Sequence, residues 1–169
     1  MPANIEIKAY AHDFEALQSQ AEKLSDTPCQ VISQVDTFFN CPTGRMKLRE
    51  LAPDLGQLVH YQRLDVRGPK HSEYRIFETH DPERLKDILS HSYGVRGIVS
   101  KVRHLYMVGQ TRIHLDDVQG LGKFVELEVV LQPGQSDEEG QAVAEELLHK
   151  LGIQPGDLIE AAYMDLLER

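Results

Sequence analysis

The sequence lacks the features of membrane-spanning and secreted proteins. It contains no run of about 18 apolar residues, the length that a helix needs to cross a membrane. The N-terminal residues Met1–Asn4 show no basic segment leading into an apolar one, so we expect no signal peptide. The 2 cysteines, Cys29 and Cys41, are too few for a disulfide framework. We therefore expect a cytoplasmic protein with two unpaired thiols.

Basic residues are scarce in the last quarter of the chain. Residues 126–169 contain 2 Lys and Arg against 11 Asp and Glu, which accounts for the net charge of −9, whereas residues 1–125 contain 16 of each sign. This distribution argues against a basic nucleic-acid-binding surface. An anionic small molecule would have to bind at a locally basic cleft, where the field is focused.

Internal repeats, low-complexity segments and linkers are also absent, so residues 1–169 are expected to form one domain. Hydrophobic periodicity and turn residues predict an α+β order, with one helix after the first strand and a second helix between two runs of strands. Short turns between sequential strands indicate antiparallel pairing. The predicted strands span residues 5–9, 31–39, 45–51, 58–64, 74–78, 99–108, 111–116 and 124–131. The predicted helices span residues 13–24, 81–91, 136–151 and 155–167.

Charged residues alternate with apolar ones in five short segments. The segments are Glu6–Lys8, Lys47–Arg49, Lys101–Arg103, Arg112–Asp116 and Glu126–Glu128. A period of two is the period of a strand, so each segment points its charges to one sheet face and its apolar residues to the other. Any one of these segments fits a solvated strand face with salt bridges. Five of them together favour a polar cavity for a highly charged ligand.

Cationic and anionic side chains occur together on these strand faces, and this mixture indicates which kind of ligand the cavity binds. A triphosphate carries about four negative charges, and its binding requires directed N–H groups such as those of arginine. Carboxylates beside those cations would repel the ligand unless a divalent metal bridges them. The pattern therefore predicts a site for a metal and a phosphate together.

Several motifs in order resemble one family. Ile5–Lys8 is similar to the ExExK signature of the CYTH superfamily, also called triphosphate tunnel enzymes. Asp36–Phe39 followed by Met46–Glu50 resembles the DTYF and LRxRE region of that family. Residues 108–128 look most like the class IV adenylyl cyclase branch, and Tyr163–Leu167 is similar to the C-terminal SYxDLL. The resemblance covers nearly the whole chain.

This resemblance implies an eight-stranded antiparallel β-tunnel with helices packed on the outside. It also implies Mg²⁺ or Mn²⁺ held by carboxylates beside a bound triphosphate. The implied metal ligands are Glu6, Asp116, Glu126 and Glu128. The implied triphosphate-binding residues are Lys8, Lys47, Arg49, Arg63, Lys101, Arg103 and Arg112. Lys8 and Glu6 are the candidate catalytic residues.

One position departs from the family signature. Asn4 stands where ExExK has its first glutamate, and a neutral amide is a weaker ligand than a carboxylate for a hard divalent cation. No HxH or HExxH spacing occurs, so we predict no histidine ligand. His114 shares its strand face with Arg112 and Asp116. This leaves two places open for it, the tunnel wall or the core or surface as filler, and we favour the second.

Three functions remain open from the sequence. The first is a metal-dependent cyclase that converts ATP to cyclic AMP and pyrophosphate. The second is a hydrolase of inorganic triphosphate, thiamine triphosphate or a nucleoside triphosphate. The third, motivated by Asn4, is a non-catalytic binder of polyphosphate or nucleotide. In each case the expected partner is a small molecule rather than a nucleic acid or a membrane, and a homodimer is left open.

Overall fold

The protein forms a closed barrel of antiparallel strands in a computed structural model, which describes residues 2–169. Eight strands follow in the order β5-β4-β3-β2-β6-β7-β8-β1, and β1 pairs with β5 to close the barrel. A short additional strand, β9, pairs with the end of β1. The strands are β1 (Ala3–Tyr10), β2 (Gln30–Phe39), β3 (Arg45–Ala52), β4 (Leu55–Arg63), β5 (Lys70–Thr79), β6 (Val95–Val108), β7 (Thr111–Val118), β8 (Gly122–Val130) and β9 (Leu158–Ile159).

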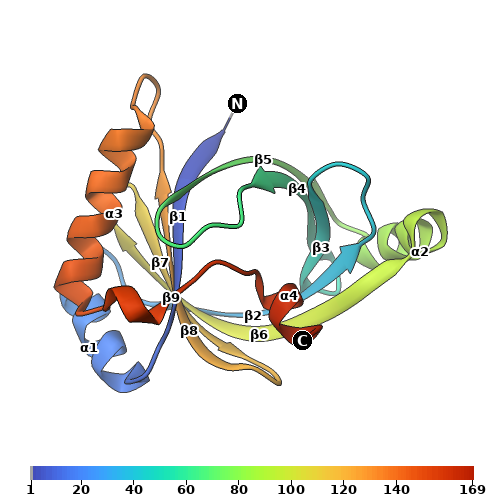
Figure 1. The fold of residues 1–169 in the computed structure, drawn as a ribbon. Coiled ribbons are helices and arrows are strands. Elements are labelled where there is room, and N and C mark those ends of the chain that lie inside the picture. The colour runs from blue at the N-terminus through green and yellow to red at the C-terminus, as the bar shows by residue number, and fades with distance from the viewer. Residues whose placement is uncertain (1) are drawn as a thin grey trace.

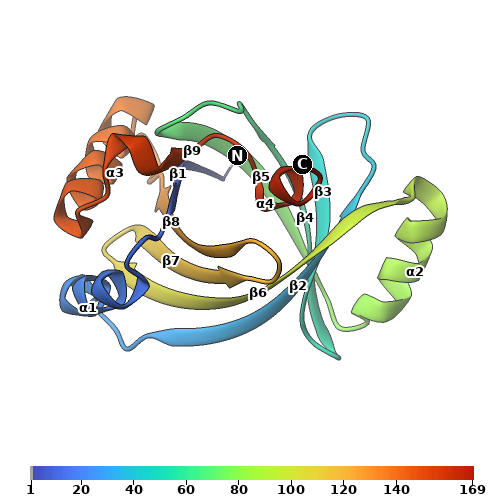
Figure 2. The same ribbon diagram turned by 60° about the horizontal axis from the view of Figure 1, so that its bottom comes forward.

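Three helices lie outside the barrel, and the fourth, α4 (Tyr163–Leu167), lies at one of its mouths (Figure 1). The three are α1 (Phe14–Leu24), α2 (Pro82–Tyr93) and α3 (Asp137–Leu151), and a 3₁₀ turn, η1 (Pro155–Asp157), follows α3. Helices α1 and α3 pack together against β1, β7 and β8, whereas α2 lies on the other side of the barrel beside β2, β3 and β4 (Figure 2). None of the helices in residues 2–169 has the length and apolar character of a membrane span.

The outward faces of β1, β7 and β8 form the main hydrophobic core. Ile5, Ile113 and Leu127 are at most 1% exposed and pack with α1 and α3 residues such as Ala21 and Leu147. Each of these strand residues has a charged neighbour in sequence, whose side chain points inward because side chains alternate along a strand. The helices therefore bury the apolar half of the alternating pattern, and the charged half faces the barrel interior.

One end of the interior is apolar and closed. Phe38, Val99 and Phe124 point inward there and pack against Tyr163 and Met164 of α4. A Cβ atom on Gly97 of β6 would collide with the side chain of Met164, so glycine permits the close approach of α4. The next inward position on each of these strands is charged. The barrel is thus a tunnel that α4 blocks at one end.

The α+β fold class and the eight-stranded antiparallel barrel are confirmed. Several local predictions are wrong. Strands β4 and β6 begin at Leu55 and Val95, three and four residues before the predicted starts at 58 and 99. Residues 70–72, predicted as loop, belong to β5, where they pair with β1 to close the barrel. The helix predicted over residues 155–167 is divided into η1, β9 and α4. Leu158 and Ile159 pair instead with β1, and Ile159 is buried, so tertiary contacts override the local helical preference.

Candidate active site

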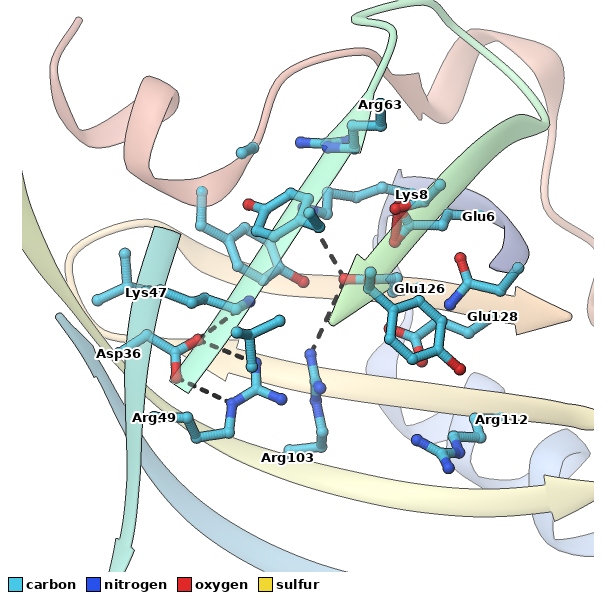
Figure 3. A pocket seen from close by; sticks show the side chains of 18 of the residues that line it. Glu6, Lys8, Asp36, Lys47, Arg49, Arg63, Arg103, Arg112, Glu126 and Glu128 are labelled. Carbon is cyan, nitrogen blue, oxygen red and sulfur yellow. Dashed lines mark hydrogen bonds and ion pairs between the residues drawn. The ribbon is translucent and has the colours of Figure 1, made fainter. Parts of the chain in front are cut away.

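The tunnel encloses a cavity of about 230 Å³ that is lined mainly by charged side chains. The cationic side chains come from six strands: Lys8, Lys47, Arg49, Arg63, Lys70, Lys101, Arg103 and Arg112. The carboxylates are Glu6, Asp36, Glu126 and Glu128. Positive charges therefore exceed negative ones by four when all groups are ionised. Figure 3 shows most of these side chains converging on one space.

The structure brings all seven predicted phosphate-binding residues into this cavity, together with three of the four predicted metal ligands. Their roles remain predictions. The fourth carboxylate, Asp116 on β7, is fully buried and does not line the cavity. It accepts two hydrogen bonds from Arg103, of 2.8 Å each, and a third of 2.9 Å from the hydroxyl of Tyr163. Asp116 thus fixes the side chain of Arg103. Its carboxylate oxygens accept hydrogen bonds from Arg103 and Tyr163, and its role as a metal ligand stays a prediction.

Asp36 on β2 organises the opposite wall. It accepts hydrogen bonds of 2.9 and 3.0 Å from Arg49 and lies 3.5 Å from Lys47 Nζ and 3.6 Å from Lys101 Nζ. Burial alone would raise the pKa of Asp36, but these three cations hold it well below its usual range. One carboxylate therefore keeps three cations in place, and it leaves other N–H groups of each free for a ligand.

The lysines of the cavity are held in an unfavourable environment for their charge. Burial and the neighbouring Arg103 lower the pKa of Lys101 to about 7, and burial and Arg49 lower that of Lys47 to about 8. The pKa of Lys8 is also lowered, mainly by burial. A bound anion would reverse these shifts because it favours the protonated form. The cavity is therefore electrostatically prepared for an anion.

Three carboxylates gather where β1 meets β8. Glu6 lies directly opposite Glu128 in the strand register, and Glu126 lies opposite Lys8. Burial and then the charges of Glu126 and Glu6 raise the pKa of Glu128 to about 7. Burial and Glu126 also raise the pKa of Glu6. Carboxylates placed this close repel one another, and a cation between them would relieve the repulsion.

Unpaired polar atoms at this wall fit a divalent cation. Oε1 of Glu6 and Oδ1 of Asn4 are buried and have no hydrogen-bond partner within residues 2–169. Oxygen donors of this kind are the ligands that Mg²⁺ and Mn²⁺ prefer. The residues present therefore suit a divalent metal held by Glu6, Glu126 and Glu128.

Three residues of the site are not among those predicted from the sequence. Asp36 lies two residues from Phe38 on β2, so the strand period places both side chains on the same inward face. Lys70 lies in a segment expected to be a loop; it is 3% exposed, and its Nζ donates to backbone carbonyls of Val66 and Glu160. Tyr163 places its ring 3.9 Å from Lys8 Nζ. No local pattern predicts this last contact, because it depends on where α4 lies.

His114 is buried on the inward face of β7, the face that it shares with Arg112 and Asp116. It is 3% exposed and lies opposite Glu126 in the register of β7 and β8. Its Nδ1 is 4.0 Å from Oε1 of Glu128. Burial and the nearby Arg103 hold its pKa well below the usual value, so the imidazole is neutral.

The chain is thus a closed antiparallel barrel whose interior holds a cationic cavity and a cluster of carboxylates. A family model described as CYTH domain matches residues 2–163, so the chain belongs to the CYTH family. This confirms the family suggested by the sequence motifs.

Known relatives agree with this assignment. The chain is 25% identical to "Putative adenylate cyclase MJ0240" of Methanocaldococcus jannaschii, with 96% of this chain and 97% of the relative covered. Among solved structures it is similar to the PH1012 protein of Pyrococcus horikoshii, with a TM-score of 0.85, 24% identity and coverage of 96% and 98% of the two chains. It is also similar to HpAC1 from Hippeastrum, with a TM-score of 0.66, 17% identity and coverage of 99% and 95%. At these identities the structural likenesses show the shared tunnel fold.

Proposed function

We propose that the protein is a divalent-metal-dependent enzyme that converts ATP to cyclic AMP and pyrophosphate. The observation that carries this proposal is the tunnel cavity, whose eight cationic and four carboxylate side chains leave an excess of four positive charges when all are ionised. A bound triphosphate, with roughly four negative charges, would balance that excess and keep the lysines protonated. The name of the relative from Methanocaldococcus jannaschii supports the choice of ATP.

The reaction forms a bond between the ribose 3′-oxygen and the α-phosphorus, and it breaks the bond from the α-phosphorus to the leaving pyrophosphate. Glu6 and Lys8 lie on the same inward face of β1. Burial and then Glu126 raise the pKa of Glu6, and in this proposal one of its carboxylate oxygens accepts the proton of the 3′-hydroxyl while the other helps to hold the metal. Lys8, which a bound triphosphate keeps protonated, binds the phosphate oxygens. Mg²⁺ or Mn²⁺, when bound, neutralises charge on the phosphate oxygens.

The arginines position the triphosphate. Arg49 and Arg103 each use two N–H groups on a buried carboxylate, which fixes the guanidinium plane. Their other N–H groups are directed donors for phosphate oxygens. Because the carboxylates hold these donors before the ligand arrives, little reorganisation is needed as charge develops on the leaving pyrophosphate.

A second candidate is hydrolysis of a triphosphate by attack of water on the terminal phosphorus, with release of orthophosphate. The size of the cavity favours it. A volume of about 230 Å³ is slightly below the 300–1,000 Å³ typical of small-molecule pockets, and it suits a triphosphate group better than a whole nucleotide. The structural relative HpAC1 is described as an adenylyl cyclase candidate with a dominant triphosphatase activity.

Product analysis separates the two reactions. The purified protein is incubated with ATP, inorganic triphosphate or thiamine triphosphate in Mg²⁺ or Mn²⁺, and the products are resolved by chromatography. A cyclase gives cyclic AMP and pyrophosphate from ATP, and a hydrolase gives orthophosphate. Glu126→Gln should abolish either activity, and Glu145→Gln, a change at an exposed position of α3, should not. Absence of every product would reject both reactions and leave a binder.

A further inference from the structure

The wall formed by β7 and β8 carries a histidine among the carboxylates. His114 Nδ1, a carboxylate oxygen of Glu126 and one of Glu128 all lie within 4.8 Å of one another. The antiparallel register explains this arrangement, because His114 pairs with Glu126 and Glu128 lies two residues along on the same face. The three side chains therefore converge from two adjacent strands.

The buried nitrogen of this histidine has no partner of its own. The side chain of His114 is only 4% exposed, so water does not reach it freely. Within residues 2–169, its Nδ1 is buried and makes no hydrogen bond. A buried polar atom without a partner is costly, so such an atom calls for an explanation. The nearest acidic atom, Glu128 Oε1, is 4.0 Å away, which is too far for a hydrogen bond and suits two ligands of one ion.

From this geometry we infer that His114 is a nitrogen ligand of the divalent metal, together with Glu126 and Glu128. Bonds of about 2.1 Å allow two ligand atoms to lie up to about 4.2 Å apart, so small side-chain rotations close the set on one ion. With Glu6 from β1, the cation would meet three carboxylates and one imidazole. This inference rests on the proposed metal dependence, and it adds a ligand that the carboxylate pattern does not contain.

The histidine also offers a reason why Asn4 is tolerated. Asn4 removes one carboxylate from the β1 side of the site, and His114 supplies a donor from the β7 side. The ligand set thereby changes from oxygen alone to oxygen and nitrogen. Imidazole favours cations of the first transition series over Mg²⁺, which is hard and binds oxygen. The site should therefore prefer Mn²⁺ to Mg²⁺.

Electron spin echo spectroscopy of bound Mn²⁺ tests this directly, because it detects the magnetic coupling of a directly bound nitrogen. The full-length protein receives Mn²⁺ alone, without nucleotide. We expect ¹⁴N coupling from one imidazole, and its replacement by ¹⁵N coupling in protein grown with ¹⁵N-histidine. This comparison needs no substitution, so it does not depend on the folding of a variant.

Substitution of single histidines then shows which one gives the nitrogen coupling. His114→Gln should abolish the nitrogen coupling and weaken Mn²⁺ binding by about 10-fold or more. Binding of Mg²⁺ should fall less, because glutamine still offers an oxygen. His91→Gln, at an exposed position of α2, is the matched control and should keep both the coupling and the affinity.

The outcomes separate this inference from the proposed function. Mn²⁺ that binds without nitrogen coupling, or coupling that persists in His114→Gln, overturns the histidine ligand. A protein that binds no Mn²⁺ also overturns it. In each case the product analysis decides independently whether the protein turns over a triphosphate. Nitrogen coupling without any turnover would instead support the ligand and reject the proposed enzyme.

Discussion

Arg103 and Asp116 form a bidentate ion pair, with both hydrogen bonds 2.8 Å long, and neither side chain is more than 5% exposed. They lie directly opposite each other on β6 and β7. Breaking a buried pair leaves one charge without compensation, which is strongly destabilising. Asp116 therefore stabilises the tunnel and fixes the guanidinium of Arg103 at the cavity.

The first prediction concerns this pair. Asp116→Asn should lower the free energy of unfolding by about 3–5 kcal/mol, because Arg103 remains buried without its partner. Thermal and urea unfolding measure this loss. Asp117→Asn, at the exposed neighbouring position, is the control and should change stability little. If Asp116→Asn instead keeps its stability and no longer binds Mn²⁺, Asp116 is a metal ligand, as the family resemblance implies.

The second prediction concerns the carboxylate cluster. Glu128→Gln should stabilise the metal-free protein, by up to about 1 kcal/mol, because it removes repulsion with Glu6 on the opposite strand. The same change should weaken Mn²⁺ binding, measured by calorimetry. Opposite effects on stability and affinity distinguish a ligand from a structural residue. A variant that loses both would show that Glu128 holds the fold together.

The strand period was enough to predict which charges share the tunnel. Alternation alone placed Glu6, Lys47, Arg103 and Glu128 on inward faces, and the structure has all four lining the cavity. The pairing of these charges needs more than alternation, because it depends on the register between strands. The two-residue turn at Gly109 and Gln110 does fix one register, in which position 103 meets position 116.

Other parts of the site could not be predicted from local patterns. Lys70 lies at the start of β5, where the sequence around Gly68 and Pro69 is typical of a loop. It becomes a strand residue only because β1 offers a partner that closes the barrel. Tyr163 reaches the cavity through α4, which is separated from β6 and β7 by more than forty residues. Such contacts depend on tertiary packing, and a single sequence does not specify them locally.

The third prediction concerns Asn4, which stands where the ExExK signature has its first glutamate. Asn4→Glu should raise Mn²⁺ and Mg²⁺ affinity by about 10-fold, because it adds a carboxylate beside Glu6 on the same face of β1. In the metal-free state the additional buried charge should lower the melting temperature. Calorimetry with each metal and thermal unfolding with and without metal measure the two effects. Asn4→Gln changes the size without adding charge, and it should raise neither affinity. An affinity unchanged by Asn4→Glu would place the metal away from position 4.

The fourth prediction follows from the lowered pKa of Lys101. Burial and Arg103 bring this pKa to about 7 in the unliganded protein, so Lys101 is mostly neutral at pH 8. A bound triphosphate favours the charged amine and raises the pKa, so binding takes up a proton. The contribution of Lys101 to affinity is therefore full below pH 7, and it declines as the pH rises towards the pKa of the complex. Calorimetry with inorganic triphosphate in chelator, in two buffers of different ionisation enthalpy, measures the proton uptake at pH 8.

Lys101→Arg is the informative control for this uptake. Arginine keeps the positive charge at every pH of the experiment, so it has no proton to gain when the triphosphate binds. The triphosphate contributes the same protons of its own in both proteins, and the difference between them isolates position 101. We expect the variant to take up fewer protons at pH 8 and to show a flatter dependence of affinity on pH. Equal uptake by both proteins would mean that Lys101 is already charged before the ligand arrives, and that burial in the tunnel does not lower its pKa.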